Sequence, residues 1–255
     1  MPEILRYQPG SFCWTELATT DMVSARKFYS GLFGWTVNTV PVGETREYTM
    51  MQIAGKDVAA LAELKNGERE RGVLPHWFCF VSVASADRTV SSAEELGGKV
   101  LAGAFDVLDS GRMAVIQDPT GAMIGLWEPR NHIGARLGLE LNTMCWTELL
   151  TPDRRVSGEF YTQLFGWTTK AEGDYTEYLL SGASQAGMIQ IEEGWGDVPP
   201  RWNVYFRVND CDDAAARAMD LGGSIIVPPG DIPGVGRFST LQDPLGAEFS
   251  VIRLE

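Results

Sequence analysis

Two short segments of identical sequence carry the side chains best suited to chemistry. Cys-Trp-Thr-Glu-Leu occurs at residues 13–17 and again, letter for letter, at residues 145–149. The period of a strand is two residues, so Glu16 and Glu148 each share a face with the tryptophan two positions earlier. A carboxylate beside an indole loses hydration, which raises its pKa and makes it a usable general base near neutral pH. We therefore predict Glu16 and Glu148 to be catalytic residues.

The two segments belong to a duplication that spans most of the chain. An offset of 132 residues also relates Leu-Phe-Gly-Trp at 32–35 to the same letters at 164–167. Later matches, such as Gln-Asp-Pro at 117–119 and 242–244, have an offset of 125. We infer two copies of one domain, the second shortened in one loop between Trp167 and Pro200. The predicted domains are residues 8–129 and 142–255, and residues 130–141 form the linker.

Each copy has the pattern of two βαβββ units, so the chain has four and belongs to the α+β class. In the first unit a strand over 11–18 precedes the capping group Thr19-Thr20-Asp21, and a helix over 22–33 ends at Gly34. The second unit has a helix over 87–96. The remaining strands predicted in the first copy are 47–53, 57–63, 76–83, 99–102, 113–117 and 123–127.

Composition excludes several classes of function. A net charge of −13 argues against nucleic acid and anionic membranes as partners, because both favour basic patches. No apolar run is long enough to span a membrane, and the first residues lack the features of a secretory signal, so we expect a cytoplasmic protein. The four cysteines are predicted to be free thiols. No nucleotide-binding motif is present, and we expect no cofactor.

The order of elements and two motifs resemble the vicinal-oxygen-chelate superfamily, which includes glyoxalases, bleomycin-resistance proteins and extradiol dioxygenases. The motifs are an Asp-capped helix containing Phe-Tyr-x-x-x-x-Gly-Trp and a later Asp-Pro-x-Gly turn, each present twice. The tandem layout is most similar to an actinobacterial subgroup that includes mycobacterial culture-filtrate antigens and streptomycete polyketide-cluster proteins described as hydroxylases. The resemblance implies two cup-shaped mixed sheets.

In metal-dependent members of this superfamily, each cup supplies four ligand positions. The resemblance places these positions at Trp14, Phe78, Gly125 and Leu61 in the first copy, and at Trp146, Asn203, Ser250 and Met188 in the second. The side chains of tryptophan, phenylalanine and leucine, and glycine, which has none, do not bind hard or borderline metal cations. We therefore predict that both metal sites are lost.

Strand alternation predicts which side chains line each cup and contact a ligand. The ligand-binding candidates are Trp14, His76, Phe78 and Trp127 in the first copy and Trp146, Arg201, Asn203 and Ser250 in the second, with Tyr205 as a third catalytic candidate. Cys13, Thr15 and Leu17 are predicted to face the helix. The side chains lining the first cup are mostly aromatic and suit a flat apolar ligand. Those lining the second cup are polar and suit hydroxyl, carbonyl or carboxylate groups of a ligand.

Each candidate also has a purely structural interpretation. The tryptophans could fill the space that metal and substrate occupy in relatives. The two glutamates could lie at the cup rims or be neutralised by Arg112 and Arg237. His76 stands at a strand start, where a surface histidine is common, and His132 lies in the linker, where we expect no functional role.

Two functions fit these features. The first is a metal-independent enzyme of secondary metabolism, a lyase, isomerase or hydroxylase-like tailoring enzyme that uses carboxylate general acid/base chemistry on a small aromatic or polyketide-like metabolite. The second is a non-catalytic protein that sequesters such a molecule, as bleomycin-resistance proteins do. A metal-dependent glyoxalase or dioxygenase fits less well because the ligands are missing. The tandem copies can pair internally, so we expect a monomer.

Overall fold

Two eight-stranded sheets form the framework of the protein, one from each copy. The computed structural model describes residues 3–42 and 46–255, and its strand orders are β2-β3-β4-β1-β5-β8-β7-β6 and β10-β11-β12-β9-β13-β16-β15-β14. The central strands of each sheet, β1 with β5 and β9 with β13, pair antiparallel. The two βαβββ units that build a sheet therefore belong to the same copy.

The elements follow the same order in both copies. The first contains β1 (Phe12–Thr19), α1 (Met22–Phe33), β2 (Thr36–Val42), β3 (Arg46–Ile53), β4 (Lys56–Glu63), α2 (Asn66–Glu70), β5 (His76–Ser82), α3 (Ala86–Glu95), β6 (Lys99–Val107), β7 (Gly111–Gln117) and β8 (Met123–Pro129). The second contains β9 (Met144–Thr151), α4 (Arg154–Phe165), β10 (Thr168–Glu172), β11 (Tyr175–Leu180), β12 (Ala183–Gln190), the 3-10 turn η1 (Glu193–Trp195), β13 (Arg201–Arg207), α5 (Cys211–Asp220), β14 (Ser224–Ile232), β15 (Gly236–Gln242) and β16 (Glu248–Leu254).

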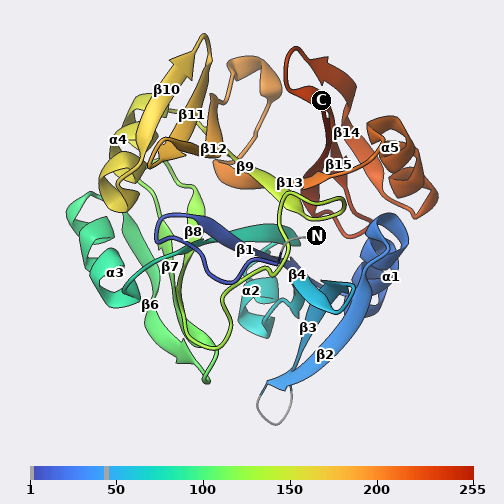
Figure 1. Cartoon of the computed structure of the whole chain (residues 1–255), viewed down its shortest axis with the longest axis horizontal. Helices are drawn as coiled ribbons and strands as arrows, with labels where there is room; N and C mark the ends of the chain where they lie inside the picture. Colours follow the sequence, from blue (N-terminus) through green and yellow to red (C-terminus); the bar gives the residue numbers. More distant parts are fainter. Residues whose placement is uncertain (1–2, 43–45) are drawn as a thin grey trace.

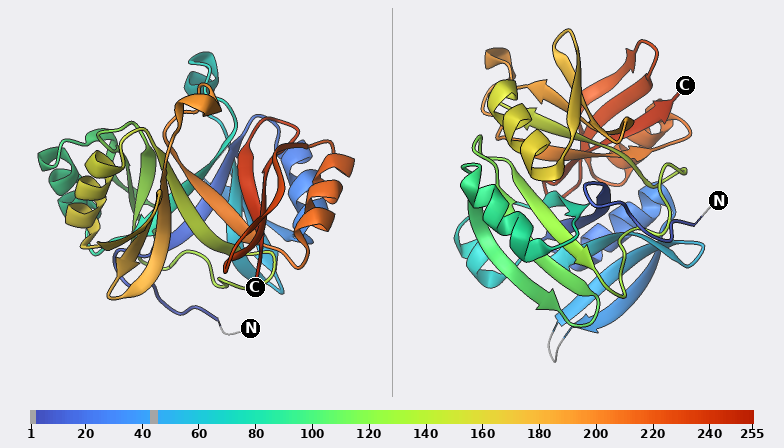
Figure 2. Two further views of the ribbon diagram at one scale, coloured as in Figure 1. Left: turned by 90° about the horizontal axis from the view of Figure 1, so that it is seen from above. Right: turned by 60° about the vertical axis from the view of Figure 1, so that its left-hand side comes forward.

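The sheets curve into two cups that lie back to back and open on opposite sides of the molecule (Figure 1). Helices α1 and α5 pack against each other at one end of the joint between the sheets, and α3 and α4 pack at the other (Figures 1 and 2). We call the concave face of the β1–β8 sheet the first cup and that of the β9–β16 sheet the second cup.

The long helices begin and end as their sequences predict. The Asp21 side chain accepts hydrogen bonds from the first-turn amides of α1, and Gly34 ends that helix with φ +70°. Asp153 and Gly166 do the same for α4. These signals explain why the helix predicted over 22–33 is confirmed at both ends.

The two copies share one apolar core with an approximate two-fold relation. The Trp35 indole donates to the Asn142 carbonyl at 2.8 Å, and the equivalent Trp167 indole donates to the Gly10 carbonyl at 2.8 Å. The Tyr29 hydroxyl of α1 donates to Asp243 of the other copy at 3.1 Å. The two copies thus bury equivalent surfaces against each other, as the two halves of a symmetric interface do.

Two details differ from the sequence-based predictions. β2 is an edge strand that the alternation pattern missed, because Asn38 and Pro41 are typical of turns. The second copy is shortened in two places, not one. Glu16 pairs with Ala60 and Glu148 with Gly187, so the offset between the copies at these strands is 127, intermediate between 132 and 125.

No helix among residues 3–42 and 46–255 is long and apolar enough to cross a membrane.

Candidate functional site

Glu16 and Glu148 lie at equivalent places in the centre of their sheets. Glu16 pairs with Phe78 across β5, and Glu148 pairs with Asn203 across β13. Trp14 belongs to an apolar cluster separate from the main core and lined by Phe80 and Trp127. This cluster fills the first cup, as the strand parity of Trp14 predicts.

The prediction from strand alternation that Cys13 faces the helix is wrong. A β-bulge between Phe12 and Trp14 shifts the ladder by one residue, so Cys13 packs in the first-cup cluster and not against the helix. All four cysteines are free thiols; three are buried and Cys145 is half-buried. Burial raises the pKa of the Cys79 and Cys145 thiols to about 12, so both stay protonated and unreactive near neutral pH.

In the first cup a tyrosine connects the predicted tryptophan and glutamate. The Trp14 indole donates to the Tyr48 hydroxyl at 3.1 Å, and that hydroxyl donates to Glu16 Oε2 at 2.6 Å. Burial raises the pKa of the Glu16 carboxyl above its usual value, and the hydrogen bond from Tyr48 opposes this rise. Lys65 also stabilises the charged form from a greater distance.

The second cup repeats this arrangement and adds a second tyrosine. The Trp146 indole donates to the Tyr175 hydroxyl at 3.0 Å, and Tyr175 is hydrogen-bonded to Glu148. The Tyr205 hydroxyl donates to Glu148 Oε1 at 2.8 Å. Burial raises the pKa of Glu148, and the two tyrosines oppose the rise. The pKa of Tyr205 lies well above its usual value because of burial and the neighbouring carboxylate, so its hydroxyl stays protonated.

The wall around Tyr205 is a continuous hydrogen-bonded network. Asn203 Nδ2 donates to Ser250 Oγ at 2.9 Å, and Ser250 contacts Thr240 Oγ1 at 2.9 Å and is hydrogen-bonded to Tyr205. Asn203 and Ser250 are both buried, at 5% and 0% exposure. The predicted residues Glu148, Tyr205, Asn203 and Ser250 are therefore brought together in one place.

The first cup replaces this network with apolar contacts. Phe80 occupies the position of Tyr205, and Gly125 that of Ser250. A Cβ atom at Gly125 would lie 2.2 Å from the Phe80 ring, so the ring covers the glycine closely. The predicted ligand residue Phe78 lies half-buried beside Phe80, with ring centroids 5.1 Å apart.

Tyr48 and Tyr175 are the functional candidates that the sequence analysis missed. They stand in Glu-Tyr-Thr at 47–49 and Asp-Tyr-Thr at 174–176, which share the offset of 127. A comparison of the two copies at the offsets 132 and 125 alone does not align these two segments. The repeat itself contained the signal.

The donor set does not fit the metal that the superfamily resemblance implies. The fourth ligand position was placed wrongly at Leu61 and Met188, which pair with core leucines of β1 and β9 and pack in the main core. The cup-facing positions are Ala60 and Gly187. A Cβ atom at Gly187 would lie 1.8 Å from the Tyr175 hydroxyl, so a phenol occupies that space. Among the described residues no group of three His, Cys, Asp or Glu side chains could hold a metal ion.

The linker covers one end of the first cup. The Ala135 amide donates to the Cys13 carbonyl at 2.8 Å, and the Trp127 indole donates to the His132 carbonyl at 2.8 Å. The His132 ring meets Trp14 edge-on, with centroids 4.7 Å apart. Trp14 is consequently only 5% exposed, whereas the equivalent Trp146 is half-buried.

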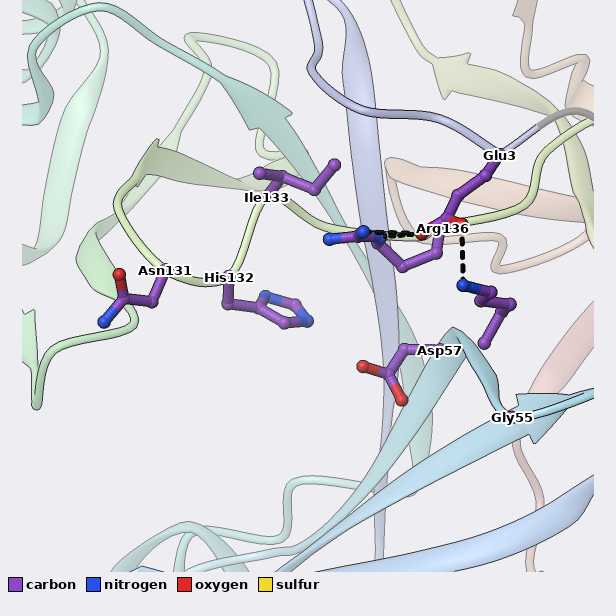
Figure 3. Close-up of a pocket in the computed structure, with 8 residues that line it drawn as sticks. Glu3, Gly55, Asp57, Asn131, His132, Ile133 and Arg136 are labelled. Atoms are coloured by element: carbon purple, nitrogen blue, oxygen red, sulfur yellow. Dashed lines mark hydrogen bonds and ion pairs between the residues drawn. The ribbon is translucent and has the colours of Figure 1, made fainter.

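A small polar cavity of about 220 Å³ lies under the same linker (Figure 3). Figure 3 shows the His132 ring and the Asp57 carboxylate on this cavity, beside the ion pairs of Glu3 with Arg136 and Lys56. His132 Nε2 has no hydrogen-bond partner among the described residues, and burial lowers the pKa of this histidine. The linker histidine thus remains neutral and packs as part of the cover.

The other candidates lie at the edges of the cups. His76 is half-buried, and its Nδ1 lies 2.8 Å from the Leu74 carbonyl. Arg201 forms an ion pair with Glu248. Arg112 and Arg237 do not neutralise the glutamates, because they bind surface aspartates of their own copies: Asp87 and Asp106, and Asp212 and Asp231.

Comparison with known proteins agrees with this architecture. The family model of the Glyoxalase/Bleomycin resistance protein/Dioxygenase superfamily matches residues 11–126 and 143–251. "Putative glyoxylase CFP32" of Mycobacterium tuberculosis is 42% identical over 99% of this chain and 98% of its own length. The anthracycline biosynthesis protein DnrV of Streptomyces peucetius is 34% identical over 98% and 95%.

Solved structures share the fold at low identity. A Mn(II)-bound glyoxalase from Novosphingobium aromaticivorans has a TM-score of 0.65 and 17% identity, covering 97% of this chain and 83% of its own. An extradiol ring-cleaving dioxygenase from B. fuscum has a TM-score of 0.66 and 15% identity, covering 100% and 75%.

Proposed function

The chain belongs to the glyoxalase/bleomycin resistance protein/dioxygenase superfamily, and from this premise we propose that its second cup is a metal-independent site for a small aromatic or polyketide-like metabolite. Glu148 is the proton acceptor and Tyr205 the hydrogen-bond donor to substrate. The similarity to an anthracycline biosynthesis protein supports a role in secondary metabolism.

One observation carries the proposal: the carboxyl of Glu148 lies in a cup with Tyr205, Asn203 and Ser250 on one wall and the half-buried Trp146 beside it. A carboxyl with a raised pKa accepts protons near neutral pH. A phenol that stays protonated stabilises an oxygen on which negative charge develops. The half-buried indole offers a face for a planar ring.

These parts suit proton transfer next to a carbonyl group. Glu148 takes a proton from an acidic carbon, the electron pair moves onto the carbonyl oxygen, and Tyr205 hydrogen-bonds the resulting enolate. Return of the proton, at the same carbon or at another position, completes an exchange or an isomerisation without any oxidant. Such chemistry fits a lyase or isomerase better than a hydroxylase, since no step needs electrons from outside.

We propose further that the first cup does not bind ligand. The linker covers Trp14, so the space-filling interpretation suits this tryptophan, and Glu16 has an apolar wall instead of a second tyrosine. We also propose domain bounds of 8–129 and 142–255, with the linker at 130–141. The shared core of the two copies supports a monomer that acts as an internal pseudo-dimer.

Sequestration without chemistry is the second candidate. It is favoured by one observation: both tyrosines already donate to Glu148, so the carboxyl is satisfied at rest. Both candidates place the ligand in the second cup. They differ in whether Glu148 moves a proton.

Proton exchange separates the two candidates. We expect the wild-type protein in D₂O to accelerate deuterium uptake at the acidic methylene carbon of 1,8-dihydroxyanthrone, measured by mass spectrometry. Glu148→Gln should reduce this rate by at least about 100-fold, because a general base contributes that much. The matched variant Glu16→Gln should keep the wild-type rate. Equal losses in both variants would contradict the assignment, and no exchange by a wild-type protein that binds the anthrone would favour sequestration.

A further inference from the structure

The loops that follow β4 and β12 stand at equivalent places but differ in how they are held. In Figure 1, α2 lies between the arms of the first cup and the loop with η1 lies between the arms of the second. Figure 2 shows that both loops extend beyond the strand ends at the same end of the molecule. Each loop therefore stands at one end of a cup.

The first-copy loop is fixed to the body of the protein. The Arg69 side chain donates to the Thr20 carbonyl at 2.9 Å and the Leu64 carbonyl at 3.2 Å, and it forms an ion pair with Glu63 at 2.7 Å. The Leu64 amide also donates to the Thr19 carbonyl at 2.8 Å. These contacts hold the loop in one position.

The second-copy loop is hydrogen-bonded to the body of the protein at its start. Beyond that point, the hydrogen bonds of its described residues stay within the loop. The Ile191 amide donates to the Thr151 carbonyl at 2.8 Å. After it, the Trp195 amide donates to Glu192 and the Val198 amide to Gly196, both inside the loop. Cβ atoms at Gly194 and Gly196 would meet nothing within 4 Å, so open space surrounds the turn.

Trp195 is the residue at the tip of this turn, and its side chain is 41% exposed. The other seven tryptophans of the chain are buried or half-buried. An exposed indole between two glycines has the surface to stack on a ring and the backbone freedom to move onto it. Its loop joins β12, which carries Gly187, to β13, which carries Asn203 and Tyr205.

We propose that Trp195 is a ligand-contacting residue of the second cup, closing over a planar ligand whose other face rests on Trp146 and the tyrosines. This inference rests on the proposed function, because it needs a flat ligand in that cup. It adds a second aromatic face, supplied by the loop over 191–200. The ligand class is thereby narrowed to planar molecules thin enough to lie between two aromatic surfaces.

The test uses 1,8-dihydroxyanthraquinone as a probe and the full-length chain. Removing one stacking face should raise the dissociation rate about three- to tenfold in Trp195→Ala, and Trp195→Phe should restore most of the loss. Leu74→Ala, which removes an exposed apolar side chain from the first-copy loop, should leave the rate unchanged. Hydrogen exchange of residues 191–200 should slow when the probe binds.

The outcomes separate the inference from the function on which it rests. If Trp146→Ala weakens binding while Trp195→Ala does not, and the loop gains no protection, the role of Trp195 is wrong and the second cup stands as the site. If the probe does not bind, or Trp146→Ala leaves binding unchanged, both the proposed ligand site and this inference are overturned.

Discussion

In both cups a tryptophan indole donates to a tyrosine that is hydrogen-bonded to a glutamate carboxyl, yet the walls around that carboxyl differ. Trp14, Tyr48 and Glu16 form one hydrogen-bonded chain, and their equivalents in the second copy form another. Both copies thus have the hydrogen bonds that link the carboxyl on the first strand to a tyrosine on the third. The cups differ in the burial of the tryptophan and in the side chains of the neighbouring wall.

Two changes separate the cups. The first cup has the wall pair Phe80 and Gly125 where the second has Tyr205 and Ser250, so ring packing in one corresponds to hydrogen bonds in the other. The linker contacts β1 and β8 at the first cup, through hydrogen bonds to the Cys13 carbonyl and from the Trp127 indole. Under the proposed function, the first copy serves packing and the second copy binds the ligand.

The largest effect is expected from the fit of the linker on the first cup. Gly134 has φ +109°, and a Cβ atom there would lie 2.3 Å from the Cys13 carbonyl oxygen. Gly134→Ala should reduce the free energy of unfolding by about 2–4 kcal/mol, through backbone strain and this clash. Denaturant unfolding measures the change, with Gly103→Ala, where a Cβ atom meets nothing within 4 Å, as control. Equal stability of both variants would mean that the linker is not a fixed cover.

A smaller effect is expected on the carboxyl pKa values. Tyr205 stabilises the ionised form of Glu148, so Tyr205→Phe should raise the pKa of Glu148 by about one unit. Glu148 would then become ionised, and able to accept a proton, only at higher pH. The acidic limb of the pH profile of the exchange rate should shift to higher pH by the same amount. Phe80→Tyr, the reverse change in the first cup, should lower the pKa of Glu16. Carboxyl titration by NMR checks both, and a fall for Tyr205→Phe would contradict the hydrogen-bond assignment.

The smallest effect is expected from metal removal, because the described residues of neither cup form a suitable donor set. Purified protein should contain far less than one Zn, Ni, Fe or Mn per chain by elemental analysis. Chelator treatment should leave the Tm and the exchange rate unchanged. One tightly bound transition metal per chain would refute metal independence for both cups.

The sequence predicts much of this because its signals are local. The Asp21 cap and Gly34 define α1 at both ends, and the repeated pentapeptide locates Trp14 and Glu16 on the cup face. The alternation of side chains along the strand predicted the wrong face for Cys13, because a β-bulge shifts the register there and no residue type in the segment indicates a bulge. The cover of the first cup could not be predicted, since contact between the linker and β1 joins residues more than 110 positions apart.

The central claim is that only the second cup binds ligand, and binding stoichiometry tests it most directly. Calorimetric titration with 1,8-dihydroxyanthraquinone should give one site per chain, weakened several-fold by Trp146→Ala and unaffected by Trp14→Ala. Circular dichroism of both variants would confirm that each is folded. Two equivalent sites per chain, or loss of binding in Trp14→Ala with Trp146→Ala unchanged, would contradict the account.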